Sequence, residues 1–350
     1  MKMSDVAKIA NVSPATVSRV LSNPDLVSKK TRDKVLEVIN QVNYQPHSVA
    51  RQFRTRETKT ILAVVPDITS AFFSEVLRGI EHVAIKEGYQ VILGDTENNL
   101  ERESDYVNLL LQKQVDGMVL LTARLEKERL EELSEHFPIV LACEYIDGLN
   151  VPTVSIDNIS AARKATEHLI QLGHTKIAHI CGPMNVILGR DRLRGFRQAM
   201  MSNDLDVDPS YIQEGDLTIE SSESGYNQMM KLLALETPPT GVFVYNDEMA
   251  MGAIKAVKDS GLRVPEDVAI VGFDNLKMST VIEPHLSSID QPKYNIGQKA
   301  MNLLLQMINK EKINKHSFVM KDNLIIRDSC GGKSESFPHS HESFKKNISV

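Results

Sequence analysis

The sequence lacks the features of a membrane or exported protein. No stretch of its 350 residues approaches the roughly 18 uninterrupted apolar residues that a membrane helix needs. The first residues, MKMSDVAKIA, have no apolar core of the kind that a signal peptide carries. We therefore expect a protein that stays in the cytoplasm and has no membrane partner.

Cysteine is scarce as well. Cys143, Cys181 and Cys330 are the only three, and they lie far apart in the chain. An odd, scattered set of cysteines fits reduced thiols better than a disulfide framework or a zinc site. We expect no metal site.

The short motifs of common catalytic and nucleotide-binding sites are missing. The chain has no G-x-S-x-G, no P-loop, no H-E-x-x-H, and no G-x-G-x-x-G after its first apolar segment. Its histidines do not have the spacing of metal ligands. We therefore expect neither an enzyme nor a cofactor.

What the chain does have is a basic head on an acidic body. Residues 1–60 carry eleven Lys and Arg against five Asp and Glu, a net charge of +6, in a chain whose total charge is −6. The remaining residues therefore sum to −12. This distribution is typical of a nucleic-acid-binding protein whose body is kept away from the phosphates.

Residues 1–45 predict a small all-α domain. Ser4 is placed to cap a helix that runs to about Ala10. Ser13 is a favoured N-cap residue, and Pro14 after it predicts a second helix to about Ser22. A helix, a tight turn and a second helix form the helix-turn-helix plan.

A third helix and a linker follow. Ser28 is placed to cap this helix, and its apolar side chains recur at helical spacing at Val35, Val38, Ile39 and Val42. Residues 46–59 are then expected to form a hinge helix and a polar linker. The hinge segment 47–54 is too short to hold as a helix by itself in water.

From Ile61 onward, short apolar segments alternate with amphipathic ones. The apolar segments include ILAVV, VDGMVLL, PIVLA, KIAHIC, GVFVY and VAIVG. Expected helices lie near residues 72–87, 100–114, 125–134, 161–172, 190–201, 222–235, 248–260 and 294–308. Near-continuous apolar strands that alternate with helices predict parallel sheets covered on both faces.

Two such series predict a two-lobed α/β core over residues 60–330. The N-lobe is expected at about 60–158 and 290–320, and the C-lobe at about 159–289 and 321–330. Residues 331–350 are polar and rich in Ser, and they predict a disordered tail.

Several segments occur in a recognisable order. The head contains DVAKIANVSPATVSRVLSNPDLVSKKTRDKV and then NYQPHSVAR, and the body contains PDITSAFFSEVLRGIE, GHTKIAHICGP, NDEMAMGAIKA, GLRVPEDVAIVGFDN and IDQPKYNIG. From about Ser4 to Arg327 the chain resembles the LacI/GalR family of bacterial transcription regulators. Within this family, TILAVVPDI and FFSEVLRGIE are most similar to the cytidine-repressor subgroup.

The resemblance implies an architecture and a set of partners. It implies a helix-turn-helix head, a hinge helix and a core like that of periplasmic sugar-binding proteins. It also implies a homodimer that binds pseudo-palindromic operator DNA and a small-molecule effector.

The second helix is expected to lie in the major groove. Arg19 can place its planar guanidinium on a guanine edge, although it could also be a solvated helix residue. Pro14 and Ala15 could only touch a thymine methyl group or leave room for the bases. Contacts to phosphates, which position the protein without specifying sequence, are expected from Thr16, Ser18 and Ser28.

The hinge is expected to enter the minor groove. The resemblance implies that it folds on DNA and wedges an apolar side chain between two base steps. Phe53 stands at this position, where a leucine is usual; its ring could instead pack within the protein. The predicted DNA-binding set is completed by Ser13, Tyr44, Ala50, Arg51 and Arg54.

Polar residues follow the apolar segments of the core. Ligands of open parallel sheets bind outside the carboxyl ends of the strands. Asp67, Asp95, Asn246 and Asp274 stand at such ends, and their oxygens and amides suit the hydroxyl groups of a sugar or nucleoside. Asp67 and Asp95 are equally compatible with turns, and we expect Asp247 to be a helix N-cap.

The resemblance adds further effector contacts. It implies that Arg192, Asn246 and Asp274 line the cleft, that Phe72 and Phe73 stack on the ligand, and that Gln291 lies at the crossover between the lobes. Leu217 follows Gly215-Asp216 where purine receptors of the family have an aromatic residue. Together with Val186 and Leu188, Leu217 argues against a purine effector and weakens the assignment of cytidine.

These observations predict a DNA-binding repressor. Its operator affinity is expected to depend on a sugar or nucleoside that changes the distance between two hinge segments of the dimer. The alternatives are a global carbon-type regulator controlled by a phosphocarrier protein, and a plain sugar-binding protein.

Overall fold

The computed structural model describes residues 2–44, 57–216 and 220–332. Internal contacts divide the chain into two compact units, Met1–Thr58 and Lys59–Val350. We describe the first unit as the head and the second as the core.

The head is a small helical domain. Its elements are α1 (Met3–Ile9), α2 (Pro14–Ser22), the 3-10 turn η1 (Pro24–Leu26) and α3 (Lys29–Gln41). Apolar side chains from all three α-helices form one buried cluster that includes Val6, Val17, Val20, Val35 and Val38. The N-cap predicted for α2 is confirmed, because Oγ of Ser13 accepts the N–H of Thr16 at 3.1 Å.

Of the two other caps predicted for the head, that of α1 was wrong and the position of that of α3 was correct. The N-cap of α1 is Lys2 and not Ser4, because the carboxylate of Asp5 accepts the N–H of Lys2 at 2.8 Å and the helix therefore begins earlier. Ser28 is the N-cap of α3, but its hydroxyl donates to Oγ1 of Thr31 at 3.0 Å and makes no capping bond.

The described residues of the core form two sheets of six strands each. We call N-lobe the sheet ordered β11-β5-β4-β3-β1-β2 with the helices beside it. Its strands are β1 (Thr60–Val65), β2 (Gln90–Asp95), β3 (Gly117–Leu120), β4 (Ile139–Ala142), β5 (Thr153–Ile156) and β11 (Ser317–Met320). Its helices are α5 (Ala71–Lys86), α6 (Leu100–Leu111), α7 (Lys127–His136) and α12 (Lys293–Ile308).

The C-lobe has the sheet ordered β12-β10-β9-β8-β6-β7, and its strand order matches that of the N-lobe. Its strands are β6 (Ile177–Cys181), β7 (Ile212–Glu214), β8 (Gly241–Val244), β9 (Ala269–Asp274), β10 (Ser287–Asp290) and β12 (Asn323–Ile325). Its helices are α8 (Asn158–Gln171), α9 (Ile187–Ser202), α10 (Ser221–Leu233) and α11 (Asp247–Asp259), with the short turns η2 (Pro209–Tyr211), η3 (Lys277–Thr280) and η4 (Asp328–Cys330).

The sheets are parallel with one exception. The strands of the N-lobe pair in parallel, as predicted, and so do β6 to β10. The exception is β12, which pairs with β10 in the antiparallel direction. The chain crosses between the lobes after β5, after β10 and after β11, so the lobes share three connecting segments.

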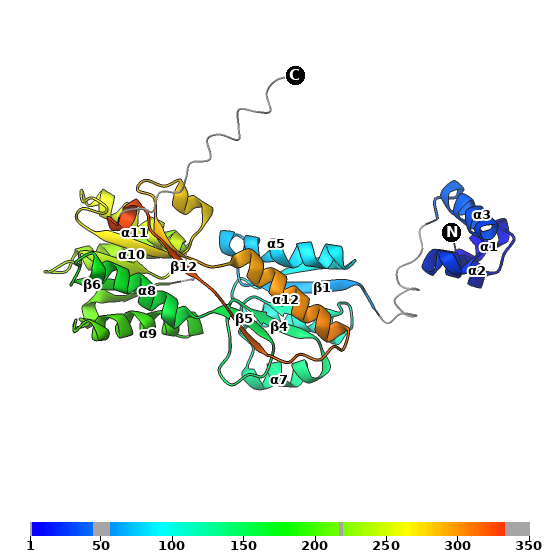
Figure 1. Ribbon diagram of the computed structural model, residues 1–350, viewed down its shortest axis with the longest axis horizontal. Helices are drawn as coiled ribbons and strands as arrows, with labels where there is room; N and C mark the ends of the chain where they lie inside the picture. Colours follow the sequence, from blue (N-terminus) through cyan, green and yellow to red (C-terminus); the bar gives the residue numbers. More distant parts are fainter. Residues whose placement is uncertain (1, 45–56, 217–219, 333–350) are drawn as a thin grey trace, which may run out of the picture. The chain divides into compact units, whose positions relative to one another are not determined.

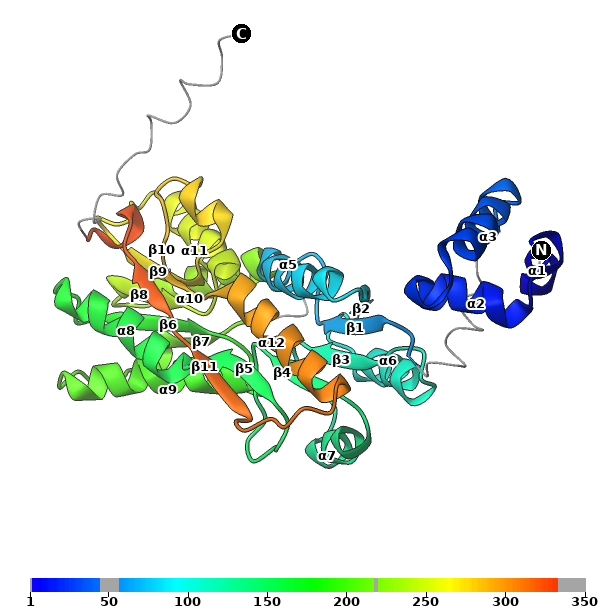
Figure 2. The same cartoon turned by 45° about the vertical axis from the view of Figure 1, so that its right-hand side comes forward.

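Helices α5 and α12 lie side by side on the N-lobe (Figures 1 and 2). Two glycines allow this close approach: a Cβ on Gly297 would lie 2.0 Å from the carbonyl oxygen of Val76, and one on Gly79 would lie 2.1 Å from that of Tyr294. No larger residue fits at either position without moving a helix.

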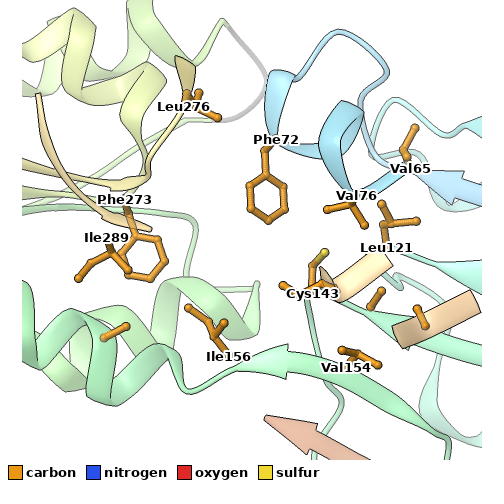
Figure 3. Packing of buried hydrophobic residues seen from close by; sticks show 14 of the residues in the cluster. Val65, Phe72, Val76, Leu121, Cys143, Val154, Ile156, Phe273, Leu276 and Ile289 are labelled. Atoms are coloured by element: carbon orange, nitrogen blue, oxygen red, sulfur yellow. The ribbon is translucent and has the colours of Figure 1, made fainter. Parts of the chain in front are cut away.

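The largest apolar cluster runs from one lobe into the other. Figure 3 shows Phe72, at the start of α5, pointing into the space between Cys143 of the N-lobe and Phe273 of the C-lobe. Ile156 and Ile289, next to two of the crossovers, belong to the same cluster. The lobes therefore share buried apolar surface near their connecting segments.

Candidate effector site and DNA-binding surface

A cavity of about 390 Å³ lies between the two lobes, and we call it the interlobe cavity. Its described lining comes from the carboxyl ends of strands and the first turns of helices in both lobes. The lining residues used below are Asp67, Phe72, Phe73, Arg124, Glu144, Val186, Leu188, Arg192, Glu220, Tyr245, Asn246, Glu248, Asp274 and Gln291. Its volume falls in the range of small-molecule sites, which is about 300–1,000 Å³.

Arg192 is the most firmly held cation of the cavity. It lies on α9 and is 3% exposed. Its Nε donates to Oδ1 of Asn158 at 3.1 Å, and its Nη1 donates to the carbonyl oxygen of Tyr245 at 2.6 Å. The guanidinium is thereby fixed in one plane, which leaves its remaining donors a defined direction.

Asp274 is the buried acid at the end of β9. Its Oδ1 accepts the side-chain amide of Gln291 at 2.6 Å. Burial raises the pKa of Asp274 to about 7, and the nearby carboxylate of Asp247 acts in the same direction against the opposing effect of Arg192. An acid with this pKa changes its protonation state near neutral pH.

The N-lobe wall carries an ion pair. Arg124 follows β3 and Glu144 follows β4, and Nη1 of Arg124 lies 2.9 Å from Oε2 of Glu144. The buried carboxylate of Glu103 on α6 accepts the main-chain N–H groups of Arg124 and Leu125, which fixes the loop that carries Arg124. Burial raises the pKa of Glu144, and Arg124 opposes this shift.

Acidic groups outnumber basic groups in the cavity. The described lining contains five carboxyl groups, on Asp67, Glu144, Glu220, Glu248 and Asp274. It contains two guanidinium groups and, among the described residues, no lysine. Arg124 is already paired with Glu144, and Arg192 already donates to two oxygens. Burial and the neighbouring Asp274 raise the pKa of Glu248.

Aromatic rings supply the apolar part of the lining. The rings of Phe72 and Phe73 pack edge to face, with centroids 5.2 Å apart. Tyr245 at the end of β8 lines the cavity from the C-lobe, and the guanidinium carbon of Arg192 lies 4.6 Å from the centroid of its ring. Carboxylates, amides and rings in one cavity suit a ligand that has both hydroxyl groups and an apolar face.

The structure brings most of the predicted effector residues together. Phe72, Phe73, Arg192, Asn246, Asp274 and Gln291 all line the interlobe cavity, as do Val186 and Leu188. Leu217 lies outside the described residues.

Asp95 has to be withdrawn from the set of effector contacts. It is not among the described lining residues, and its Oδ1 accepts the N–H of Glu97 at 3.2 Å. It therefore closes the turn after β2. Asp67 closes a turn, because its Oδ1 accepts the N–H of Thr69 at 2.8 Å, and it also lines the cavity, so it stays a candidate effector contact.

The expected N-cap at Asp247 was also wrong. The N-cap of α11 is Asn246, whose Oδ1 accepts the N–H of Met249 at 2.8 Å. Asp247 is the first helical residue and is fully buried. Its carboxylate accepts from Oγ of Ser279 and Oγ of Ser288, each at 2.6 Å, and burial raises its pKa to about 6.

Arg124, Glu144 and Glu248 were missed from the sequence. Asp274 was identified as a polar residue at the end of an apolar segment. The same pattern was available for Arg124 and Glu144, because they follow the apolar segments VDGMVLL and PIVLA. Applied to β3 and β4, the strand-end rule would have found them.

The head presents the predicted DNA-binding residues along α2. The exposed ones are Ser13, Pro14, Ala15, Arg19 and, at the start of α3, Ser28; Thr16 and Ser18 are half-buried. Tyr44 is 6% exposed and packs in the head's apolar cluster, so we assign its ring a packing role and withdraw it as a DNA contact. The hinge residues Ala50, Arg51, Phe53 and Arg54 lie outside the described residues.

Within the described part of the chain, no helix has the length and apolarity that a bilayer-crossing segment needs.

A helix-turn-helix head and a two-lobed core with a polar cavity define the class of ligand-responsive DNA-binding regulators. Comparison with known families agrees. Residues 2–47 match the family described as bacterial regulatory proteins, lacI family, and residues 166–330 match the periplasmic binding protein-like domain.

Curated relatives cover nearly the whole chain. The HTH-type transcriptional repressor CytR of Escherichia coli K12 is 44% identical over 328 residues, which are 93% of this chain and 95% of that protein. Catabolite control protein A of Priestia megaterium is 39% identical over 93% of this chain and 98% of its own length. The chain therefore belongs to the LacI family of bacterial transcription regulators.

Solved structures support the same conclusion. The lac repressor dimer bound to operator and the anti-inducer ONPF aligns with a TM-score of 0.85 at 29% identity, over 94% of this chain and 98% of that one. The regulator CcpA of Lactococcus lactis aligns with a TM-score of 0.72 at 31% identity, over 77% and 98%. The predicted fold class is confirmed, and the chain is a DNA-binding regulator rather than an enzyme.

Proposed function

We propose that the chain is a homodimeric repressor whose operator affinity is set by an uncharged sugar or nucleoside in the interlobe cavity. The observation that carries this proposal is the convergence of Arg192, Asn246 and Asp274 with two phenylalanines in a cavity between two hinged lobes. Hydroxyl groups can donate to the carboxylate and accept from the guanidinium, while the rings cover an apolar face.

The charge of the cavity favours an effector without phosphate. Five carboxyl groups stand against two guanidinium groups in the described lining, and Arg124 is already paired with Glu144. Burying a phosphate beside this excess of acidic groups is costly. A neutral sugar or nucleoside avoids this cost.

We propose the following division of labour along the chain. Residues 1–45 bind the major groove through Arg19 and its neighbours on α2. Residues 46–59 form a hinge whose Phe53 enters the minor groove, and residues 60–330 bind the effector. A protein that acts on bacterial operator DNA works in the cytoplasm.

Two measurements test this function. The full chain should retard a natural promoter fragment, and a chain without residues 1–58 should not; equal retardation by both would contradict the proposal. In a thermal-shift screen, cytidine, uridine, ribose and related neutral compounds should include at least one that raises the midpoint of the full chain. A ligand that binds the folded state stabilises it by mass action.

A further inference from the structure

Lys293 is a buried lysine at the crossover from the C-lobe to the N-lobe. It is the first residue of α12 and is 4% exposed. Its Nζ donates to three main-chain oxygens, those of Asp274 at 2.5 Å, Asn275 at 3.2 Å and Gln291 at 3.4 Å. The carboxylate of Asp290 lies 3.8 Å away.

The turn that Lys293 holds has an unusual backbone. Asp274 and Asn275 have φ values of 110° and 50°, in the region that side-chain-bearing residues rarely adopt. Such a conformation persists only where the surroundings hold it in place. An ammonium group has three donors and no acceptor, so it can bind several carbonyl oxygens at once. Lys293 therefore supplies contacts that hold this turn.

The same turn carries an acid of the interlobe cavity. The side chain of Asp274 lines the cavity, and its Oδ1 accepts the amide of Gln291. Residues 291–293 thus hold Asp274 twice, by its carboxylate through Gln291 and by its carbonyl through Lys293. A ligand that moves Asp274 must disturb this crossover segment.

Helix α12, which begins at Lys293, is rigidly packed in the N-lobe. Helix α12 lies against α5 through Gly297 and Gly79, where main-chain atoms approach too closely for any side chain. At the second residue of α12, the hydroxyl of Tyr294 lies 2.7 Å from Nδ1 of His82 on α5. Close-packed helices move together rather than deforming, so a displaced Lys293 displaces both.

We propose that Lys293 couples the effector site to the N-lobe, by tying the main chain of Asp274 to the first turn of α12. Lys293 is a positioning residue, because it is not among the described lining residues and acts through Asp274. This inference rests on the proposed function. A lysine that only stabilised the fold would change stability or effector affinity, but it would leave unchanged the ratio of operator affinities with and without saturating effector.

The experiment measures that ratio, the coupling factor, for Lys293→Met. Labelled promoter DNA is titrated with the full chain, with and without saturating cytidine, uridine or ribose, whichever stabilises the wild type. Wild-type coupling is expected in the usual range of about 5–150-fold, and the variant should fall below about twofold. Operator affinity without effector should stay within about twofold of wild type, since the head is unchanged.

Three further variants serve as controls. Lys299→Met removes another lysine of the same helix, whose Nζ lies over the ring of Phe318, and it should keep the wild-type factor. Lys293→Arg keeps a cationic donor and should retain a larger factor than Lys293→Met. If Lys293→Met does not fold by circular dichroism, Lys293→Gln, which keeps a shorter, uncharged donor group, should still lower the factor.

The outcomes separate the two proposals. If none of the probes changes wild-type operator affinity, the proposed function fails and this inference fails with it. If the wild type responds and folded Lys293→Met responds equally, only the role of Lys293 is overturned. Loss of coupling in Lys293→Met, with Lys299→Met intact, supports it.

Discussion

The guanidinium carbon of Arg192 lies 3.6 Å from the centroid of the Phe273 ring, so the cation of the interlobe cavity rests on an aromatic face. Stacking and two hydrogen bonds, to Asn158 and to the carbonyl of Tyr245, orient the same group. An effector therefore meets a cation whose position is set before binding, and this reduces the entropy lost on binding.

Replacing Arg192 by Lys should weaken effector binding by at least about tenfold, because an ammonium cannot reproduce the planar, stacked fork. It should also lower the free energy of unfolding by about 1–3 kcal/mol, since buried acceptors on Asn158 and Tyr245 lose donors. Calorimetry and urea unfolding measure the two effects. The exposed Arg197→Lys on the same helix is the control and should change neither; an unchanged effector affinity in Arg192→Lys would remove Arg192 from the site.

The pKa of Asp274, raised by burial to about 7, predicts pH-dependent effector binding. The ionised carboxylate is the stronger acceptor for a hydroxyl group, so effector affinity should rise as the pH rises from 6 to 8. The Asp274→Asn variant has no carboxyl group at this position. It should bind the effector more weakly, and its effector affinity should not rise with pH in this range. Calorimetry across that pH range decides the matter; a slope that persists in Asp274→Asn would show that another group is responsible.

Phosphorylated compounds should be poor effectors. Nucleoside 5′-monophosphates and ribose 5-phosphate should bind at least about tenfold more weakly than cytidine, uridine or ribose, because acidic side chains crowd the cavity. Glu248→Gln removes one of these acidic groups and should reduce the difference in affinity between a phosphorylated compound and its neutral counterpart. Tighter binding of the phosphorylated member of a pair would contradict the charge argument.

His179 predicts a loss of stability in acid. It is fully buried between the rings of Phe196 and Phe243, and burial lowers its pKa to about 3 from an ordinary value of 6.5. Between these values the unfolded chain binds a proton that the folded chain does not. This group's contribution to the free energy of unfolding therefore falls as the pH drops below 6.5, by at most about 1.4 kcal/mol per pH unit.

The test compares wild type with His179→Phe by urea unfolding between pH 6.5 and 4. The variant should lose less stability on acidification than the wild type does. His136→Gln, at an exposed position, should follow the wild type. Parallel pH profiles for wild type and His179→Phe would show that His179 does not titrate on unfolding.

The hinge position gives a fifth test, which measures DNA binding. Phe53→Ala should weaken operator binding severely and leave effector binding intact, because an apolar wedge unstacks a base step and alanine cannot. Phe53→Leu, which restores an apolar wedge of the size usual in the family, should retain most of the affinity. An unchanged operator affinity in Phe53→Ala would exclude the wedge.

Local signals predicted much of the fold. Ser13-Pro14 gave the start of α2, and apolar runs such as GVFVY gave buried strands, because these depend on adjacent residues. The strands β10 and β11 were missed. SSID contains two serines, and SFVM is only half-buried at the sheet edge, so neither has the continuous apolar pattern of a central strand.

The site was predictable where a rule of position applied. Asp274 and Asn246 follow strands, and parallel strands bring their carboxyl ends together. The role of Asp247 was not predictable, because its partners Ser279 and Ser288 are distant in sequence and meet it only through β9 and β10. The hydrogen bonds from Lys293 to the carbonyl oxygens of residues 274 and 275 depend in the same way on tertiary structure.

The most direct test of the account is a reciprocal titration at fixed salt concentration. Operator affinity is measured with and without saturating effector, and effector affinity is measured with and without saturating operator. Both ratios should be equal and lie in the range of about 5–150. If every compound that binds the core by calorimetry leaves the operator affinity unchanged, this result would contradict control of the head by the interlobe cavity.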